Sequence, residues 1–156
     1  MAPPRVLSFD IGTVLVRFDL AGLLKDFAWA AGSSPWRVAR LVWSRRLIDD
    51  VERGKLTGAG LHAAVREQTG YAGDLDDFRR LWCGRFRLDE RGAALFRRLA
   101  RKRPVYLLSN TNALHWEHIR KRYAFAREGA GAVLSFEVGA RKPARAIYAA
   151  ACAAAG

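Results

Sequence analysis

The 156-residue sequence predicts an α/β protein with a doubly wound parallel sheet and an inserted helical segment. Short apolar runs typical of buried strands occur at 6–10, 105–109 and 132–136. Segments with helical periodicity separate these runs, which favours a parallel sheet with right-handed crossovers. The first two runs are about ninety residues apart, which is too long for a simple crossover.

Helical patterns account for the rest of the sheet domain. They cover 93–102 before the second strand, 114–123 after it and 144–155 after the third. Pro143 suits the first turn of the last helix, because a proline lacks the N–H that this position leaves unpaired.

The long insertion contains no pattern typical of a strand. Its helical patterns cover 20–31, 35–51, 57–69 and 75–86. Four tryptophans lie in this insertion, and we expect them to pack inside a helical bundle: Trp29, Trp36, Trp43 and Trp82.

Composition excludes several classes of protein. The chain is 51% hydrophobic and 27% charged, which is typical of a folded domain. The formal charge of +12 suggests nucleic acid, but the basic residues are scattered over amphipathic segments, so we expect no nucleic-acid partner. No apolar run is long enough to span a bilayer, and no secretory signal precedes the first strand. Cys83 and Cys152 form no disulfide or metal-binding pattern, which favours the cytoplasm.

Three polar segments follow the three predicted strands. Asp10 ends the first, Ser109-Asn110 ends the second, and Lys142 follows the third. Ligands of open α/β sheets bind beyond the carboxyl ends of the strands, so these groups should converge. These three groups together suit phosphoryl transfer. A carboxylate can attack phosphorus and hold Mg²⁺, a hydroxyl can bind phosphoryl oxygens, and an ammonium can offset negative charge.

The sequence resembles the haloacid dehalogenase-like (HAD) hydrolases, in the branch that carries a helical cap after the first strand. Within that branch it is similar to sugar phosphatases of the glucose-1-phosphate phosphatase type. Four motifs carry the resemblance: FDIGTVLVRFD at 9–19, ERGKLT at 52–57, LLSNTNALH at 107–115 and VGARKPARAIY at 138–148. The resemblance implies a Rossmann-like core at 1–19 and 91–156, and a cap at 20–90 that closes over the site.

The resemblance also implies a role for each residue of the site. Asp10 would be the nucleophile and a Mg²⁺ ligand, and the backbone carbonyl of Gly12 would be a second ligand. Ser109 and the Asn110 backbone would bind the phosphoryl group, and Lys142 would be the catalytic cation beside Asp10. Residues 13–19 would form a flap that leads into the cap.

Two departures from the family pattern affect the chemistry. Most phosphatases of the superfamily have a second Asp, the general acid, where this chain has Gly12. Asp19 lies beyond the flap, so we expect it to begin the cap and not to replace that acid. The acidic fourth motif of the family is absent before Gly156, so we expect a core that is incomplete at its C-terminal end.

These observations predict a Mg²⁺-dependent phosphatase that acts on a small phosphorylated metabolite, which the resemblance indicates is a sugar phosphate. The alternative is an inactive, truncated HAD-like protein that binds phosphate or a partner. A third hypothesis is a 2-haloacid dehalogenase, which the phosphate-binding features disfavour. Other polar residues are expected to be structural: His115 as a packed or solvated helix residue, and Asp49-Asp50 as a solvated helix end.

Overall fold

The sheet consists of three parallel strands. The structure, a computed structural model, describes residues 5–42 and 45–156. Strand β4 (Val105–Ser109) lies between β1 (Leu7–Phe9) and β5 (Gly131–Leu134), and both pairings are parallel. In register, Phe9 lies beside Leu107, and Ser109 lies beside Leu134. The carboxyl ends of the three strands therefore meet at one edge of the sheet.

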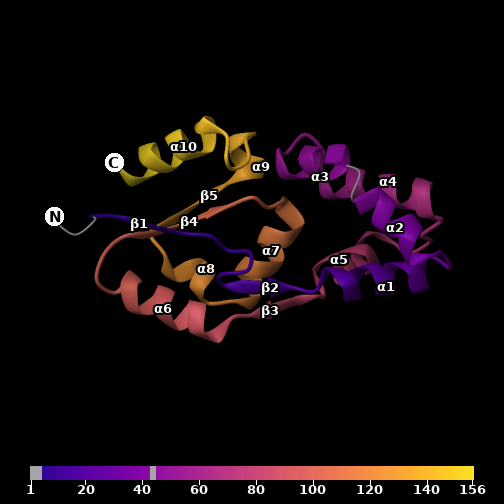
Figure 1. Cartoon of the computed structure of the whole chain (residues 1–156), viewed down its shortest axis with the longest axis horizontal. Coiled ribbons are helices and arrows are strands. Elements are labelled where there is room, and N and C mark those ends of the chain that lie inside the picture. Colours follow the sequence, from indigo (N-terminus) through magenta and orange to yellow (C-terminus); the bar gives the residue numbers. More distant parts are fainter. Residues whose placement is uncertain (1–4, 43–44) are drawn as a thin grey trace.

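Helices cover both faces of this sheet (Figure 1). Helix α10 (Arg145–Ala155) packs on β4 and β5 at one face, where Leu108, Val133 and Ile147 form a small core. Helices α6 (Glu90–Ala100), α7 (Ala113–Arg122) and α8 (Phe125–Glu128) lie at the other face. The core there is larger and includes Phe96, Leu107, Ile119 and Phe125. The predicted doubly wound α/β fold is confirmed.

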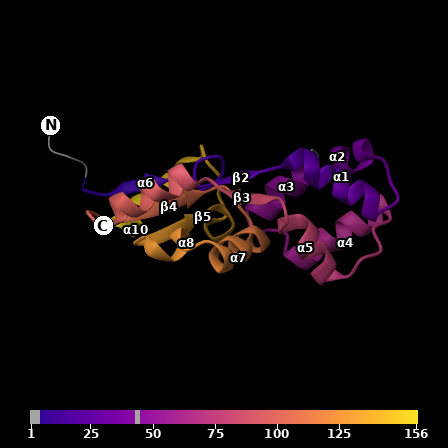
Figure 2. The same ribbon diagram turned by 90° about the horizontal axis from the view of Figure 1, so that it is seen from below.

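Five helices form the other end of the elongated molecule (Figures 1 and 2). They are α1 (Leu20–Ala30), α2 (Pro35–Val42), α3 (Arg45–Glu52), α4 (Gly58–Thr69) and α5 (Leu75–Cys83). They share a core of their own, built around Leu23, Phe27, Leu61, Phe78 and Trp82. None of the helices within the described ranges has the length and apolar character needed to cross a membrane.

A two-stranded ribbon joins the two ends of the molecule. Strand β2 (Val16–Phe18) pairs antiparallel with β3 (Phe86–Leu88), and the rings of Phe18 and Phe86 lie 4.8 Å apart. The sequence predicted no strand here and extended a helix to residue 86, which is wrong. Each strand has only three residues, too few to show an alternating pattern. Helix α5 ends at Cys83, and the N–H of the next residue, Gly84, donates to the Leu81 carbonyl.

The third predicted strand is shorter than expected. Strand β5 ends at Leu134, and Ser135 and Phe136 belong to the one-turn helix α9 (Ser135–Val138). The Ser135 hydroxyl accepts from the Thr111 N–H at 2.9 Å and donates to the Thr111 carbonyl at 3.0 Å. These bonds end the strand and tie α9 to the loop after β4.

Smaller differences concern helices and tryptophans. The predicted helix 35–51 is described as α2 and α3, on either side of residues 43–44, and α10 begins at Arg145, after Pro143. Trp82 is buried, but Trp29 and Trp36 are 88% and 80% exposed, so the expectation that they pack inside the bundle is wrong. Trp43 lies outside the described residues.

Candidate active site

Asp10 and Lys142 form an ion pair at the carboxyl edge of the sheet. Asp10 directly follows β1, and its Oδ2 lies 2.8 Å from Lys142 Nζ. Its Oδ1 accepts from the Ile11 N–H at 2.7 Å. Lys142 Nζ also donates to the Leu108 carbonyl of β4 at 2.9 Å. Two anchors on neighbouring strands thus fix the ammonium beside the carboxylate.

The side chain of Asn110 holds the loop that carries Lys142. Its Oδ1 accepts from the Lys142 N–H at 2.7 Å, and its Nδ2 donates to the Lys142 carbonyl at 3.1 Å. The sequence assigned only the backbone of Asn110 a role, so this reciprocal pair was missed. It positions Lys142 from the end of β4.

Ser109 is the last residue of β4 and is buried. Its side chain borders the cavity described below. The hydrogen bond described for its hydroxyl is a long one, 3.4 Å to the Asn110 carbonyl. The hydroxyl is therefore only weakly engaged, and a phosphoryl oxygen could replace that partner.

A tight turn follows Asp10 and presents Gly12. The N–H groups of Leu15 and Val16 both donate to the Ile11 carbonyl, at 2.9 and 3.0 Å. Thr13 has a φ of 60°, in the left-handed region that a β-branched residue rarely adopts. Its hydroxyl donates to the Gly12 carbonyl at 2.6 Å. The turn therefore fixes the conformation of the segment that carries the Gly12 carbonyl, two residues after Asp10.

The candidate metal ligands at and after Asp10 are oxygen atoms, which are the ligands that Mg²⁺ prefers. They are the Asp10 carboxylate and the Gly12 carbonyl, the two ligands that the sequence suggested. No group of three or more His, Cys, Asp or Glu side chains able to hold a metal occurs in the described part of the chain. A Mg²⁺ ion bound here would need water or substrate phosphate oxygens as further ligands, an arrangement that is common for this ion.

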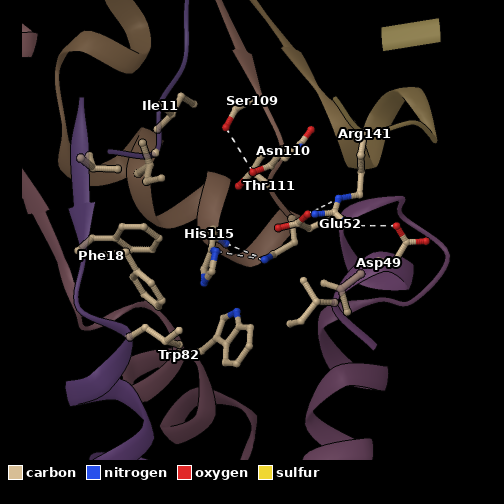
Figure 3. Close-up of a pocket in the computed structure, with 18 of the residues that line it drawn as sticks. Ile11, Phe18, Asp49, Glu52, Trp82, Ser109, Asn110, Thr111, His115 and Arg141 are labelled. Atoms are coloured by element: carbon tan, nitrogen blue, oxygen red, sulfur yellow. Dashed lines mark hydrogen bonds and ion pairs between the residues drawn. The ribbon is translucent and has the colours of Figure 1, made fainter. Parts of the chain in front are cut away.

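A cavity of about 790 Å³ lies between the sheet edge and the five-helix end (Figure 3). Gly12, Ser109, Asn110, Thr111 and Arg141 line it from the sheet side. Asp10 and Lys142 do not line it themselves, but they are chain neighbours of residues that do. The cavity size is typical of a site for a small molecule.

Arg141 connects the loop before Lys142 to helix α3. Its Nη1 lies 3.1 Å from Asp49 Oδ1, and its Nε lies 2.6 Å from Glu52 Oε2. Asp49 also pairs with Arg53 at 2.6 Å. Asp49 was expected to be a solvated helix end, and this is wrong, because it links α3 to the loop that carries Lys142.

The two carboxylates of this cluster differ in their electrostatics. Burial raises the pKa of Glu52, and the neighbouring Arg141 charge opposes that rise. Hydrogen bonds from Arg53 and Arg141 lower the pKa of Asp49. No local pattern in the sequence indicates this cluster, since it depends on how α3 packs against the loop.

His115 lines the cavity from α7, and its ring is also packed against Trp82 and Phe86, which agrees with the packed role that the sequence favoured. Asn112 caps α7: its Oδ1 accepts from the His115 backbone N–H at 3.0 Å. Its Nδ2 therefore faces His115 Nδ1, at 3.1 Å, and donates to it. Because Nδ1 accepts, the proton of the neutral imidazole is on Nε2.

Burial lowers the pKa of His115 to about 4, and a hydrogen bond to the Trp82 backbone opposes this to a smaller extent. The imidazole is thus neutral near pH 7. The ring stacks on Trp82, with centroids 5.4 Å apart and planes at 17°. His115 Nε2 and Trp82 Nε1 are both buried and make no well-formed hydrogen bond within the described residues.

The lowered pKa predicts acid sensitivity of folding. The ordinary pKa of histidine is 6.5, so His115 takes up a proton below pH 6.5 in the unfolded chain. In the folded protein it stays neutral down to about pH 4. Stability from this group is therefore complete above pH 6.5 and is lost as the pH falls toward 4, by up to about 3 kcal/mol. Urea unfolding at about pH 7.5 and about pH 5 should show a larger loss for the wild type than for His115→Gln, which cannot titrate.

A direct measurement checks the same prediction. Titration of the His115 ring protons by NMR should give a pKa far below 6.5. A pKa near 6.5, or equal losses of stability in the two proteins, would show that the ring is not held neutral by burial.

Several solved structures with a similar fold are HAD-family proteins. A HAD-family enzyme, BT-2542 of Bacteroides thetaiotaomicron, solved with magnesium and inorganic phosphate, is similar over 97% of this chain and 79% of its own, with a TM-score of 0.85 and 24% identity. A predicted HAD-like hydrolase from Porphyromonas gingivalis gives a TM-score of 0.79 at 17% identity, over 96% of this chain and 75% of its own.

A more distant structure shares the fold as well. The putative HAD-hydrolase YfnB of Bacillus subtilis, bound to magnesium, gives a TM-score of 0.65 at 18% identity, over 94% of this chain and 72% of its own. No protein-family model and no curated protein matches the sequence. The chain thus has the fold of the HAD-family hydrolases, as the resemblance implied.

Proposed function

We propose that the protein is a Mg²⁺-dependent phosphomonoester hydrolase that works through an aspartyl-phosphate at Asp10. The 2.8 Å ion pair between Asp10 and Lys142, at the strand edge where Ser109 also lies, is the observation that carries the proposal. The magnesium and phosphate bound to the similar Bacteroides enzyme support it further.

The proposed reaction has two steps, attack by Asp10 and hydrolysis of the intermediate. An oxygen of Asp10 forms a bond to phosphorus as the bond from phosphorus to the ester oxygen breaks. The ester oxygen leaves with the electron pair and takes a proton from solvent. Water then attacks the acyl phosphate, which releases phosphate and restores the carboxylate. Ser109 and the Asn110 backbone bind phosphoryl oxygens, and Lys142 offsets negative charge beside Asp10.

Asp10 and the Gly12 carbonyl are the proposed Mg²⁺ ligands. When bound, the ion would offset the repulsion between the carboxylate and an anionic phosphate. Residues 20–90 are proposed to act as the cap that excludes water from the cavity. The substrate is proposed to be a small phosphorylated metabolite in the cytoplasm, and the resemblance favours a sugar phosphate.

Phosphate release from a panel of phosphomonoesters tests the proposal. The panel should include sugar, alkyl and aryl phosphates, each with Mg²⁺ and with a chelator. We expect release that falls at least tenfold when the metal is removed, because an anionic nucleophile attacks an anionic ester. No release from any ester would favour an inactive, phosphate-binding protein, and chloride release from 2-haloacids would favour a dehalogenase.

A further inference from the structure

The inner part of the cavity is apolar. Beyond the sheet edge, its walls are formed mostly by aliphatic and aromatic side chains: Ile11, Val16, Phe18, Leu20, Leu23, Ile48, Val51, Trp82, Phe86 and Ile119. Five charged residues also line it: Asp49, Glu52 and Arg141 are paired with one another, Asp50 lies 3.9 Å from Lys55, and Arg46 is exposed. A sugar placed against the apolar part of the wall would have to bury several hydroxyls without partners there, at a cost for each.

Two N–H donors interrupt this apolar wall. Trp82 is only 3% exposed, yet its Nε1 has no hydrogen-bond partner among the described residues, and the Nε2–H of His115 makes only a poorly formed hydrogen bond, to the Trp82 backbone. Figure 3 shows the rings of Trp82 and His115 next to each other at the cavity, with these two nitrogens on the sides that face each other. A buried donor without a partner is costly in a folded protein. An acceptor atom on a ligand would remove that cost.

The rings of these two residues are already engaged. Trp82 stacks on Phe78, with planes at 14°, and on His115, with planes at 17°. Phe86 meets His115 edge to face at 87°. The indole therefore offers the cavity its N–H edge and not a free face for a sugar ring. Phe18 and Phe86 line the same part of the cavity and can contact a flat group.

The chemistry at Gly12 points in the same direction. The proposed mechanism has no side chain two residues after Asp10 to protonate the leaving oxygen. A phenolic oxygen leaves readily without a proton donor, whereas an alkoxide does not. The apolar wall and the missing acid thus favour the same class of ester.

We infer that the substrate is an aryl phosphomonoester whose ring carries an acceptor oxygen, held by the N–H groups of Trp82 and His115. This inference rests on the proposed phosphatase function, and it departs from the sugar phosphate that the resemblance favours. The phosphate would lie at Ser109 and the ring in the apolar part of the cavity.

Steady-state kinetics with matched esters test the inference. The esters are phenyl phosphate, 3- and 4-acetylphenyl phosphate and glucose 1-phosphate. We expect kcat/KM to be higher for the aryl esters than for the sugar. Trp82→Phe should lower kcat/KM about five- to tenfold for at least one acetylphenyl ester, and less than about twofold for phenyl phosphate. Comparing the variant with wild type on one ester cancels differences in leaving-group reactivity.

Trp29→Phe is the matched control, because it makes the same change at an indole that is 88% exposed. It should leave kcat/KM unchanged for every ester. Preference for glucose 1-phosphate, or equal losses on all aryl esters in Trp82→Phe, would overturn the inference and leave the phosphatase function intact.

A binding measurement separates the two proposals, since it needs neither phosphate nor catalysis. In a ¹H–¹⁵N spectrum, the indole N–H signal of Trp82 is the one that Trp82→Phe removes. Saturation with 3- or 4-hydroxyacetophenone should move this signal downfield, and phenol or glucose should not. A shift without any phosphatase activity would uphold the pocket assignment and refute the function. No shift with either ketone would refute the pocket assignment.

Discussion

Replacing Asp10 with Asn is expected to lower phosphate release at least about a thousandfold, because the variant keeps the side chain's shape and loses the nucleophile. In the structure the Ile11 N–H and Lys142 Nζ already position this carboxylate. The substitution removes the negative charge that these two groups contact. Initial rates with Mg²⁺ and the best ester of the panel measure the effect.

Asp89→Asn provides the matched control. Asp89 caps α6 by accepting from the Gly92 N–H and pairs with Arg17, and it does not line the cavity. Because Asn is an equally good helix cap, this variant should keep wild-type activity. Asp10→Asn should also stop the acid-stable labelling of the chain by a rapidly quenched phosphate ester. Activity above a tenth of wild type in Asp10→Asn would rule out the assigned nucleophile.

Local patterns in the sequence were sufficient to predict the sheet and the segments that end its strands. An apolar run that is buried on both faces and then stops at a polar residue marks both a strand and its carboxyl end. Parallel strands bring such ends to one edge, so topology alone places Asp10 and Ser109 there. Lys142 lies beyond α9, and its position depends also on the Asn110 side chain and the Leu108 carbonyl. The chemical roles of Asp10, Ser109 and Lys142 stay a prediction until the variants are measured.

The cavity wall could not be predicted in the same way. Trp82 and His115 come from α5 and α7, and Asp49 meets Arg141 across α3 and the loop before Lys142. Nothing in the periodicity of one helix specifies which residue of another helix it will contact. One local signal was available: Asn112 stands at the start of a helix three residues before His115, which is the spacing of an N-cap.

Replacing Gly12 with Asp is expected to raise kcat/KM for alkyl and sugar phosphates about a hundredfold, since it adds a proton donor beside the nucleophile. A Cβ at Gly12 would meet no atom within 4 Å, and the residue's φ is not positive, so the backbone accepts a side chain. Gly12 lines the cavity, where an ester's leaving oxygen would lie. The nearby Asp10 charge would keep the added carboxyl partly protonated near neutral pH.

Aryl phosphates distinguish this effect from a general improvement of the site. A phenolic leaving group needs little protonation, so Gly12→Asp should change kcat/KM for phenyl phosphate less than about threefold. Gly12→Asn has nearly the same shape and no transferable proton, and it should give no gain on any ester. Equal gains on alkyl and aryl esters, or an equal gain in Gly12→Asn, would mean that the missing acid does not limit this site. A gain confined to alkyl and sugar esters would show that the wild-type site works best on esters whose leaving group departs without a proton donor. Aryl phosphates have such a leaving group.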